Sequence, residues 1–257
     1  MSKRLLEGKM ALVTGAGRGL GRAFAERLAS LGCNIAVHGM REQGPSEYGG
    51  THTLSDVVRE IAETHRVRTA KLLGDLTKPE DIDRVVTEAS GGLGPIDILV
   101  HNAGGDIAAR GGKPDPNDAV HIKAEDVRAV IDRNLMSTIL VCQRVARDMM
   151  QRRSGRIITI GSIAAFKGRT NSSIYATAKA GAMHVTRCLA DQMRPYDVTV
   201  NCIAPGDTRT ERFLATRMVD PVRMAEDGTL DRIATVDEVA RVVEFFAGAM
   251  GAFVPRA

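Results

Sequence analysis

The sequence predicts an α/β fold, in which one domain is built on a doubly wound parallel sheet. Short, nearly continuous apolar runs alternate with helical patterns along the chain. Strands that are apolar throughout are typical of a parallel sheet with helices on both faces. The 257 residues, 44% of them hydrophobic and 26% charged, suit a globular protein with a sizeable core. No linker or internal repeat divides them, so residues 1–257 are expected to form a single domain.

The six expected strands are apolar runs bounded by glycine or polar residues. They are residues 10–14, 34–37, 67–73, 96–100, 156–160 and 198–203. Each is followed by a helix, because apolar residues recur there with helical spacing. Leu20, Phe24, Leu28 and Leu31 have this spacing in the first helix, and Pro79 suits the first turn of the third. The helices are residues 18–31, 53–65, 79–90, 124–152, 172–194 and 235–250.

Glycines dominate the connection after the first strand, Thr14-Gly15-Ala16-Gly17-Arg18-Gly19-Leu20-Gly21. A turn without Cβ atoms lets the backbone approach a pyrophosphate at a helix N-terminus. The run is not the GxGxxG fingerprint, because Leu20 stands where that pattern has its last glycine, and it is not a P-loop. A tight turn without a ligand is the alternative interpretation. The strand before the run and the helix after it favour phosphate binding.

A second group of residues suits carbonyl reduction. Tyr175 and Lys179 are four residues apart on one helix, so they share a face. Ser162 ends a neighbouring strand and can reach the same place. An ammonium group stabilises a nearby phenolate, and a hydroxyl can stabilise charge on a substrate oxygen. In an unrelated sequence, Tyr175 would be interpreted as a half-buried aromatic residue with its hydroxyl at the surface.

Taken in order, these motifs resemble the short-chain dehydrogenase/reductase family. The resemblance runs from about residue 8 to residue 250. Within the family, the sequence is most similar to the 3-oxoacyl-(acyl carrier protein) reductase branch. The resemblance includes the glycine spacing, the Tyr175 and Lys179 pair after Ser162, and Asn134 in the long helix. Asp75 after the third strand, Asn102-Ala103-Gly104 after the fourth and Pro205-Gly206 after the sixth complete it.

The resemblance implies a Rossmann fold and an NAD(P)-dependent enzyme that interconverts a secondary alcohol and a ketone. Its implied catalytic set is Asn134, Ser162, Tyr175 and Lys179. Asn134 would hold a water that links Lys179 to solvent, and Lys179 would also bind the nicotinamide ribose. The implied cofactor-binding residues are Gly15, Gly17, Arg18, Gly19, Leu20, Gly21, Arg41, Asp75, Leu76, Asn102, Ala103, Gly104, Tyr175, Lys179, Pro205, Gly206 and Thr208. A catalytically impaired dinucleotide-binding protein with a regulatory or scaffolding role is the alternative, which the intact catalytic set disfavours.

The cofactor is expected to be NADP(H) rather than NAD(H). The family's acidic residue, which binds the ribose 2′-hydroxyl, would align near Gly39, where this chain has no acid. Arg18 and Arg41 could instead face a 2′-phosphate. They could also be solvated surface charges, and Glu42 lies close enough in the sequence to oppose this preference.

Two polar segments are expected to border the substrate, at about residues 105–120 and 207–227, although the first, a long loop, could instead be a passive insertion. Arg209, Arg212, Arg217 and Arg223 lie in the second segment, and Lys167 and Arg169 follow Ser162. These charges suggest a polar or anionic alcohol or ketone substrate, although they could simply be solvated. His101, which stands before Asn102, is expected to be a structural variant.

The C-terminal sequence departs from the family pattern. The usual seventh strand has no counterpart in residues 252–257, and Pro255 cannot donate to a strand ladder. We therefore expect six strands, with an exposed edge or a rearranged neighbour. The family implies a homotetramer, and a dimer is the alternative.

Composition disfavours several other classes of protein. The net charge of +4 is spread along the chain, and aromatic residues are 4% with no tryptophan, which argues against nucleic-acid binding. Charge-free apolar stretches reach only about ten residues, against about 20 for a membrane span, and no signal peptide is visible. The cysteines, Cys33, Cys142, Cys188 and Cys202, lack metal-binding spacing. They suit free thiols in the cytoplasm, and no metal is expected.

Overall fold

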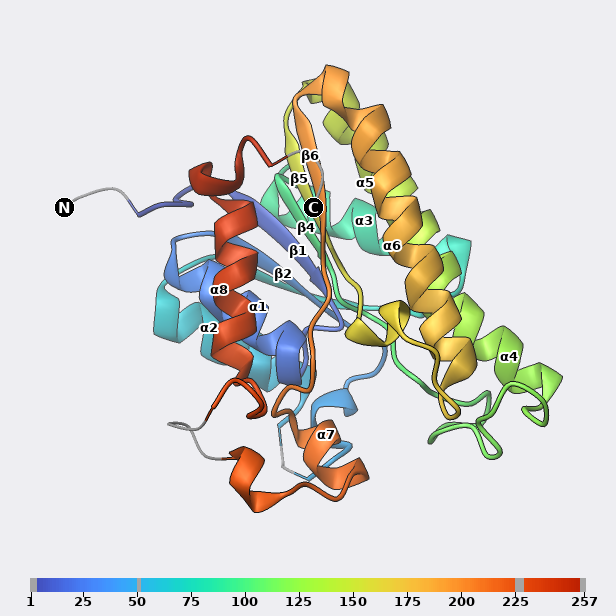
Figure 1. Cartoon of the computed structure of the whole chain (residues 1–257). Coiled ribbons are helices and arrows are strands. Elements are labelled where there is room, and N and C mark those ends of the chain that lie inside the picture. The colour runs from blue at the N-terminus through green and yellow to red at the C-terminus, as the bar shows by residue number, and fades with distance from the viewer. Residues whose placement is uncertain (1–3, 50–51, 225–228, 255–257) are drawn as a thin grey trace.

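A six-stranded parallel sheet forms the centre of the protein (Figure 1). The computed structural model describes residues 4–49, 52–224 and 229–254. The strands lie in the order β3-β2-β1-β4-β5-β6, and every neighbouring pair is parallel. The chain therefore starts in the middle of the sheet, moves out to β3 and returns to β4 beside β1. Ligands of such sheets bind beyond the strand ends at this switch point. The bounds are β1 Met10–Thr14, β2 Asn34–Gly39, β3 Thr69–Leu73, β4 Ile98–His101, β5 Gly155–Ile160 and β6 Val198–Ile203.

Helices cover both faces of the sheet, as Figure 1 shows. Alternate side chains of β1 enter opposite cores, because successive residues of a strand point to opposite faces. Val13 packs in the core that α1 (Gly19–Ser30), α2 (Leu54–His65) and α8 (Val236–Ala247) cover. Leu12 packs in the core that α3 (Pro79–Leu93), α5 (Ser137–Arg152) and α6 (Ser173–Met193) cover. The predicted α/β class and doubly wound sheet are thus confirmed.

The helix predicted over residues 124–152 is interrupted, which corrects the sequence-based prediction. It consists of α4 (Ala124–Ile131), one turn of π-helix (Asp132–Met136) and α5. The π-turn carries Asn134, whose side chain is fully buried. Single π-turns of this kind are frequent at functional sites, and apolar periodicity alone does not reveal them.

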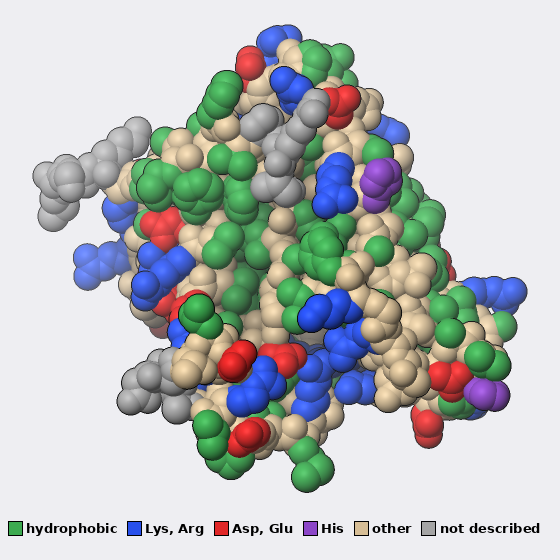
Figure 2. Space-filling model, in the orientation of Figure 1, with side chains coloured by type: hydrophobic (Ala, Val, Ile, Leu, Met, Phe, Trp, Pro, Cys, Tyr) green, Lys and Arg blue, Asp and Glu red, His purple; other side chains and the backbone are tan. Residues whose placement is uncertain are grey.

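The segment after β6 forms a further short helix, α7 (Glu211–Thr216), beside the carboxyl ends of the strands (Figure 1). Figure 2 shows basic side chains gathered in a hollow next to this segment. The described part of the segment 207–227, which is predicted to border the substrate, therefore lies near the carboxyl ends of the strands. Its residues 225–227 lie outside the described residues.

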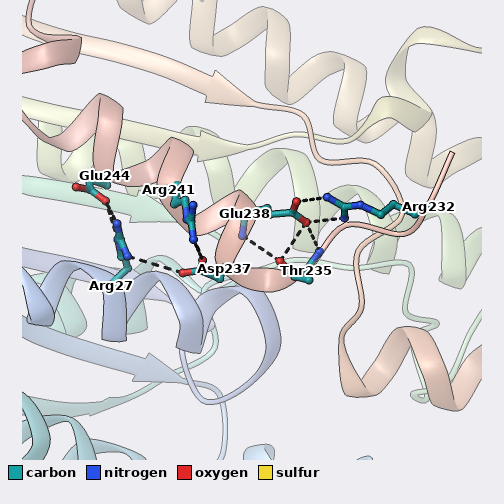
Figure 3. Close-up of polar contacts among 7 residues, drawn as sticks. All are labelled: Arg27, Arg232, Thr235, Asp237, Glu238, Arg241 and Glu244. Carbon is teal, nitrogen blue, oxygen red and sulfur yellow. Dashed lines mark hydrogen bonds and ion pairs between the residues drawn. The ribbon is translucent and has the colours of Figure 1, made fainter. Parts of the chain in front are cut away.

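Ion pairs hold α8 in place against α1 (Figure 3). Nε of Arg27 on α1 donates to Glu244 at 2.6 Å, and the same guanidinium lies 3.8 Å from Asp237. Thr235 and Glu238 form a capping box at the start of α8, and Arg232 pairs with Glu238. These contacts anchor the point where the α7 segment rejoins the body of the protein.

No seventh strand occurs among the described residues, as the sequence predicts. β6 lies at one edge of the sheet. Residues 252–254 follow α8 in a turn, in which the Val254 N–H donates to the Gly251 carbonyl, and Val254 packs on the α1–α8 core. Pro255, for which no ladder donor was expected, lies outside the described residues.

Candidate active site

Two adjoining hollows lie beyond the carboxyl ends of the strands. We call the larger, of about 640 Å³, the groove, and the smaller, of about 260 Å³, the inner pocket. Leu20, Asn102, Gly104 and Tyr175 line both, so the hollows meet at these residues. The other predicted cofactor residues in the groove are Gly15, Gly17, Arg18, Gly19, Gly21, Arg41, Asp75, Leu76 and Ala103. Those in the inner pocket are Lys179, Pro205, Gly206 and Thr208.

The glycine run forms the floor of the groove because its backbone packs closely. A Cβ atom on Gly21 would lie 2.1 Å from the Gly15 carbonyl oxygen, so no larger residue fits there. Gly15 has a φ of +63°, and a Cβ on it would lie 3.0 Å from the Cα of Ala103. Asn102 Nδ2 donates to the Gly15 carbonyl at 3.1 Å. The run has the close approach that a bound pyrophosphate requires, so these residues fit a dinucleotide cofactor.

Two buried histidines support this run from below, a role that sequence analysis missed. Thr14 Oγ1 accepts from the Asn102 and Ala103 N–H groups and lies 3.1 Å from His101 Nδ1. His38 Nδ1 accepts from the Gly15 N–H at 3.3 Å, and its Nε2 lies 3.1 Å from the Gly74 carbonyl. Burial lowers the pKa of His38 to about 4 and that of His101 to about 3. Both rings are therefore neutral at pH 7, which fits the prediction that His101 is structural.

The inner pocket brings Ser162, Tyr175 and Lys179 together from β5 and α6. Lys179 is 4% exposed, and its Nζ donates to the Ile160 carbonyl at 2.7 Å. The same ammonium lies 5.9 Å from the centre of the Tyr175 ring. Ser162 Oγ accepts from the Ala164 N–H at 3.2 Å, which leaves its hydroxyl hydrogen available to another acceptor. One pocket thus holds a phenol and a hydroxyl beside a buried cation.

Asn134 lies behind the inner pocket and lines neither hollow. Its Oδ1 accepts from the Gly105 N–H at 2.8 Å, and its Nδ2 donates to the carbonyls of Gly105 and Val130. A Cβ on Gly104 would meet both Asn134 Oδ1 and Lys179 Nζ, at 2.7 and 3.5 Å. Asn134 therefore holds the chain after β4 next to Lys179.

Arg18 and Arg41 both face an acidic residue that sequence analysis overlooked, Glu47. Arg18 Nη2 lies 2.9 Å and Arg41 Nη2 3.4 Å from Glu47 Oε2, and all three residues line the groove. Arg18 also stacks on the Tyr48 ring. Glu42, considered as an opposing charge from the sequence, pairs instead with Lys71 at 2.9 Å and does not line the groove.

The basic residues predicted at the substrate divide into two sets. Arg169, Arg212 and Arg217 line the inner pocket, whereas Lys167 does not. Arg209 donates to the Met224 carbonyl, and Arg223 pairs with Asp207. Lys113, in the 105–120 segment, also lines the pocket. Sequence analysis did not single it out, although the charge in a long polar loop was a usable signal.

The described residues hold no group of three His, Cys, Asp or Glu side chains placed to bind a metal. In the same ranges, no helix is both long and apolar enough to cross a membrane.

Comparison with known proteins agrees with this geometry. The family model described as short chain dehydrogenase matches residues 9–218. The chain is 36% identical to a cyclohexanol dehydrogenase of Rhodococcus sp. (strain TK6), covering 97% of this chain and 93% of that protein. It is 33% identical to the 3-oxoacyl-[acyl-carrier-protein] reductase of Escherichia coli (strain K12), with coverage of 96% and 93%.

Solved structures agree with the sequence relatives. A 7 alpha-hydroxysteroid dehydrogenase complexed with NADH and 7-oxo glycochenodeoxycholic acid superposes with a TM-score of 0.83 at 27% identity. That alignment covers 98% of this chain and 92% of the other. The fold and site thus define an oxidoreductase of the Rossmann type. The chain belongs to the short-chain dehydrogenase/reductase family, whose cofactor class is NAD(P), as predicted.

The buried histidines predict a specific acid sensitivity. Unfolded histidines have a pKa near 6.5 and take up protons as the pH falls, whereas His38 and His101 stay neutral in the folded protein. The stability that they contribute is therefore present above pH 6.5 and is lost toward pH 4 to 3. When the pH falls from 6.5 to 5, the free energy of unfolding should decrease by about 1.5 kcal/mol less in His101→Asn than in the unchanged protein. Urea unfolding at both pH values measures this.

The control is His121→Asn, since His121 is exposed and, among the described residues, bonds only to Asp118 in its own turn. An unchanged pH dependence in His101→Asn would contradict the assignment of a neutral, buried His101.

Proposed function

We propose that this enzyme interconverts a secondary alcohol and a ketone with NAD(P), using Ser162, Tyr175, Lys179 and Asn134. The observation that carries the proposal is that the inner pocket, with Ser162, Tyr175 and Lys179, opens onto the groove floored by the glycine run. A cofactor in the groove and a small molecule in the pocket would meet at Tyr175 and Gly104. The intact set of four residues disfavours an impaired, purely regulatory protein.

The nicotinamide cofactor supplies or accepts the hydride when bound. During reduction, the Tyr175 hydroxyl donates its proton to the substrate oxygen, where negative charge develops. Ser162 donates a hydrogen bond to the same oxygen and stabilises that charge. Lys179 favours the resulting phenolate as a fixed positive charge. Asn134 holds the Gly105 backbone beside Lys179, where a water can pass protons to solvent.

For the cofactor, we propose a preference for NADP(H) that Glu47 limits. The absence of an acid at Gly39 and the presence of Arg18 and Arg41 in the groove support the preference. The Glu47 carboxylate occupies the same guanidinium donors that a 2′-phosphate would use. Binding of NADP(H) would then require Glu47 to move away from both arginines.

We also propose a cytoplasmic homo-oligomer that associates through the helices bearing Asn134 and Tyr175, as the family resemblance implies. The four cysteines are free thiols, which suits a reducing compartment. Light scattering distinguishes tetramer, dimer and monomer.

Tyr175 is the proposed proton donor. Tyr175→Phe should lower kcat for ketone reduction about a thousandfold, since general acid catalysis contributes about 10²–10⁴-fold. The dissociation constants of NADPH and NADH, measured by fluorescence titration, should change less than about threefold. Tyr196→Phe, on a tyrosine that lines neither hollow, is the matched control. Full turnover in Tyr175→Phe would contradict the assignment of Tyr175 as the proton donor.

Glu47 is proposed to compete with the 2′-phosphate for Arg18 and Arg41. Glu47→Gln should increase the affinity for NADPH about tenfold relative to that for NADH, because it frees two guanidinium groups for the 2′-phosphate. Fluorescence titration of both cofactors measures the ratio. Glu42→Gln, which removes a charge outside the groove, should leave the ratio unchanged. An unaltered ratio in Glu47→Gln would show that the 2′-phosphate does not use these arginines.

A further inference from the structure

Positive charge is concentrated in the inner pocket. Among the described residues, five basic side chains line it but only two acidic ones, Asp106 and Asp207. The basic residues are Lys113, Arg169, Lys179, Arg212 and Arg217. Apart from Lys179 on α6, they come from three separate segments: the loop after β4, the loop after Ser162, and the α7 region. Figure 2 shows a cluster of Lys and Arg side chains in the hollow next to the α7 segment.

The two acidic residues leave most of this charge uncompensated. Asp207 is engaged by Arg217 at 3.0 Å and by Arg223 at 3.3 Å. Asp106 is 9% exposed, and its Oδ2 accepts from Asn117 and Ser172 rather than from a cation.

Besides Lys179, which donates to the Ile160 carbonyl, three of these cations lack an acidic partner among the described residues. Arg212 Nη2 donates to the Asp106 backbone carbonyl at 2.9 Å, a neutral partner that orients the guanidinium without cancelling its charge. Within the part of the chain that the structure describes, Lys113 and Arg169 make no ion pair and their side chains make no hydrogen bond. Lys113 is exposed, but partial desolvation lowers its pKa, and Arg217, Arg212 and Arg169 lower it further, while Asp106 opposes them. These cations lie close enough to repel one another, so an anion between them would relieve the repulsion.

The glycine after Gly104 allows one of these cations to approach the reacting groups. Gly105 has a φ of +142°, and a Cβ on it would lie 2.4 Å from Arg212 Nη1. Arg212 thereby packs directly on the chain segment that Asn134 holds. It lines both hollows, as Tyr175 does. The uncompensated charge thus lies beside the proposed reaction centre.

We propose that the substrate is an oxo or hydroxy acid whose carboxylate binds among Lys113, Arg169 and Arg212. This inference rests on the proposed function only for the position of the reacting carbonyl at Ser162 and Tyr175. A guanidinium binds a carboxylate with two parallel hydrogen bonds, and a flexible lysine adds a point charge. The long 105–120 loop then has a specific role, since it brings Lys113 to the pocket.

Binding can be tested without turnover, because a ketone does not react with an oxidised cofactor. Calorimetry would measure the affinities of 4-oxocyclohexanecarboxylate and 4-oxopentanoate, and of their methyl esters, for the protein with saturating NADP⁺ or NAD⁺. In at least one pair the acid should bind about tenfold more tightly than its ester. Lys113→Met combined with Arg169→Gln should reduce this preference to about twofold or less.

Lys167→Gln is the matched control, since Lys167 lies in the same loop as Arg169 but does not line the pocket. It should keep the full preference for the acid. Equal binding of acid and ester in both pairs would overturn the proposal, as would a preference that survives in the double variant. Acid-selective binding without ketone reduction by NADPH or NADH would support the anion site while contradicting the proposed function.

Discussion

The backbone of Gly15 lies against the residues that follow β4, and the shape of both hollows depends on this contact. Asn102 donates to the Gly15 carbonyl, and Gly21 leaves room for that carbonyl at the start of α1. Thr14 ties the end of β1 to the Asn102 and Ala103 N–H groups. The groove can therefore run past the end of β4 and reach the inner pocket.

The two hollows differ in how their basic side chains are paired. In the groove, Glu47 pairs with Arg18 and Arg41, so the chain supplies its own anion. In the inner pocket, Lys179 is buried on a backbone carbonyl, and Arg212 is oriented by another. Fixed cations held by neutral carbonyls are preorganised to stabilise negative charge on a bound molecule. The same arrangement suits both a developing alkoxide and, further out, a carboxylate.

The six strands and the doubly wound class of the sheet could be predicted from the sequence, because apolar runs are local patterns. The spacing of Tyr175 and Lys179 is also local, and it already places both side chains on one helix face. The π-turn at Asn134 could not, since its apolar periodicity resembles that of an α-helix. Glu47 was missed because its partner Arg18 is distant in the sequence. Lys113 was missed because it lies in a long polar loop, whose path the sequence does not reveal. The neutral state of His38 and His101 depends on burial by several strands, which no single segment reveals.

Transfer of deuterium from cofactor to product tests the central claim, that the groove holds the cofactor next to a ketone bound in the inner pocket. The protein would be given NADPH or NADH dideuterated at C4, with cyclohexanone or 4-oxocyclohexanecarboxylate. The account predicts an alcohol with one deuterium on its carbinol carbon, detected by mass spectrometry and NMR. Cofactor oxidation without deuterated alcohol, or no reduction of either ketone with either cofactor, would contradict it.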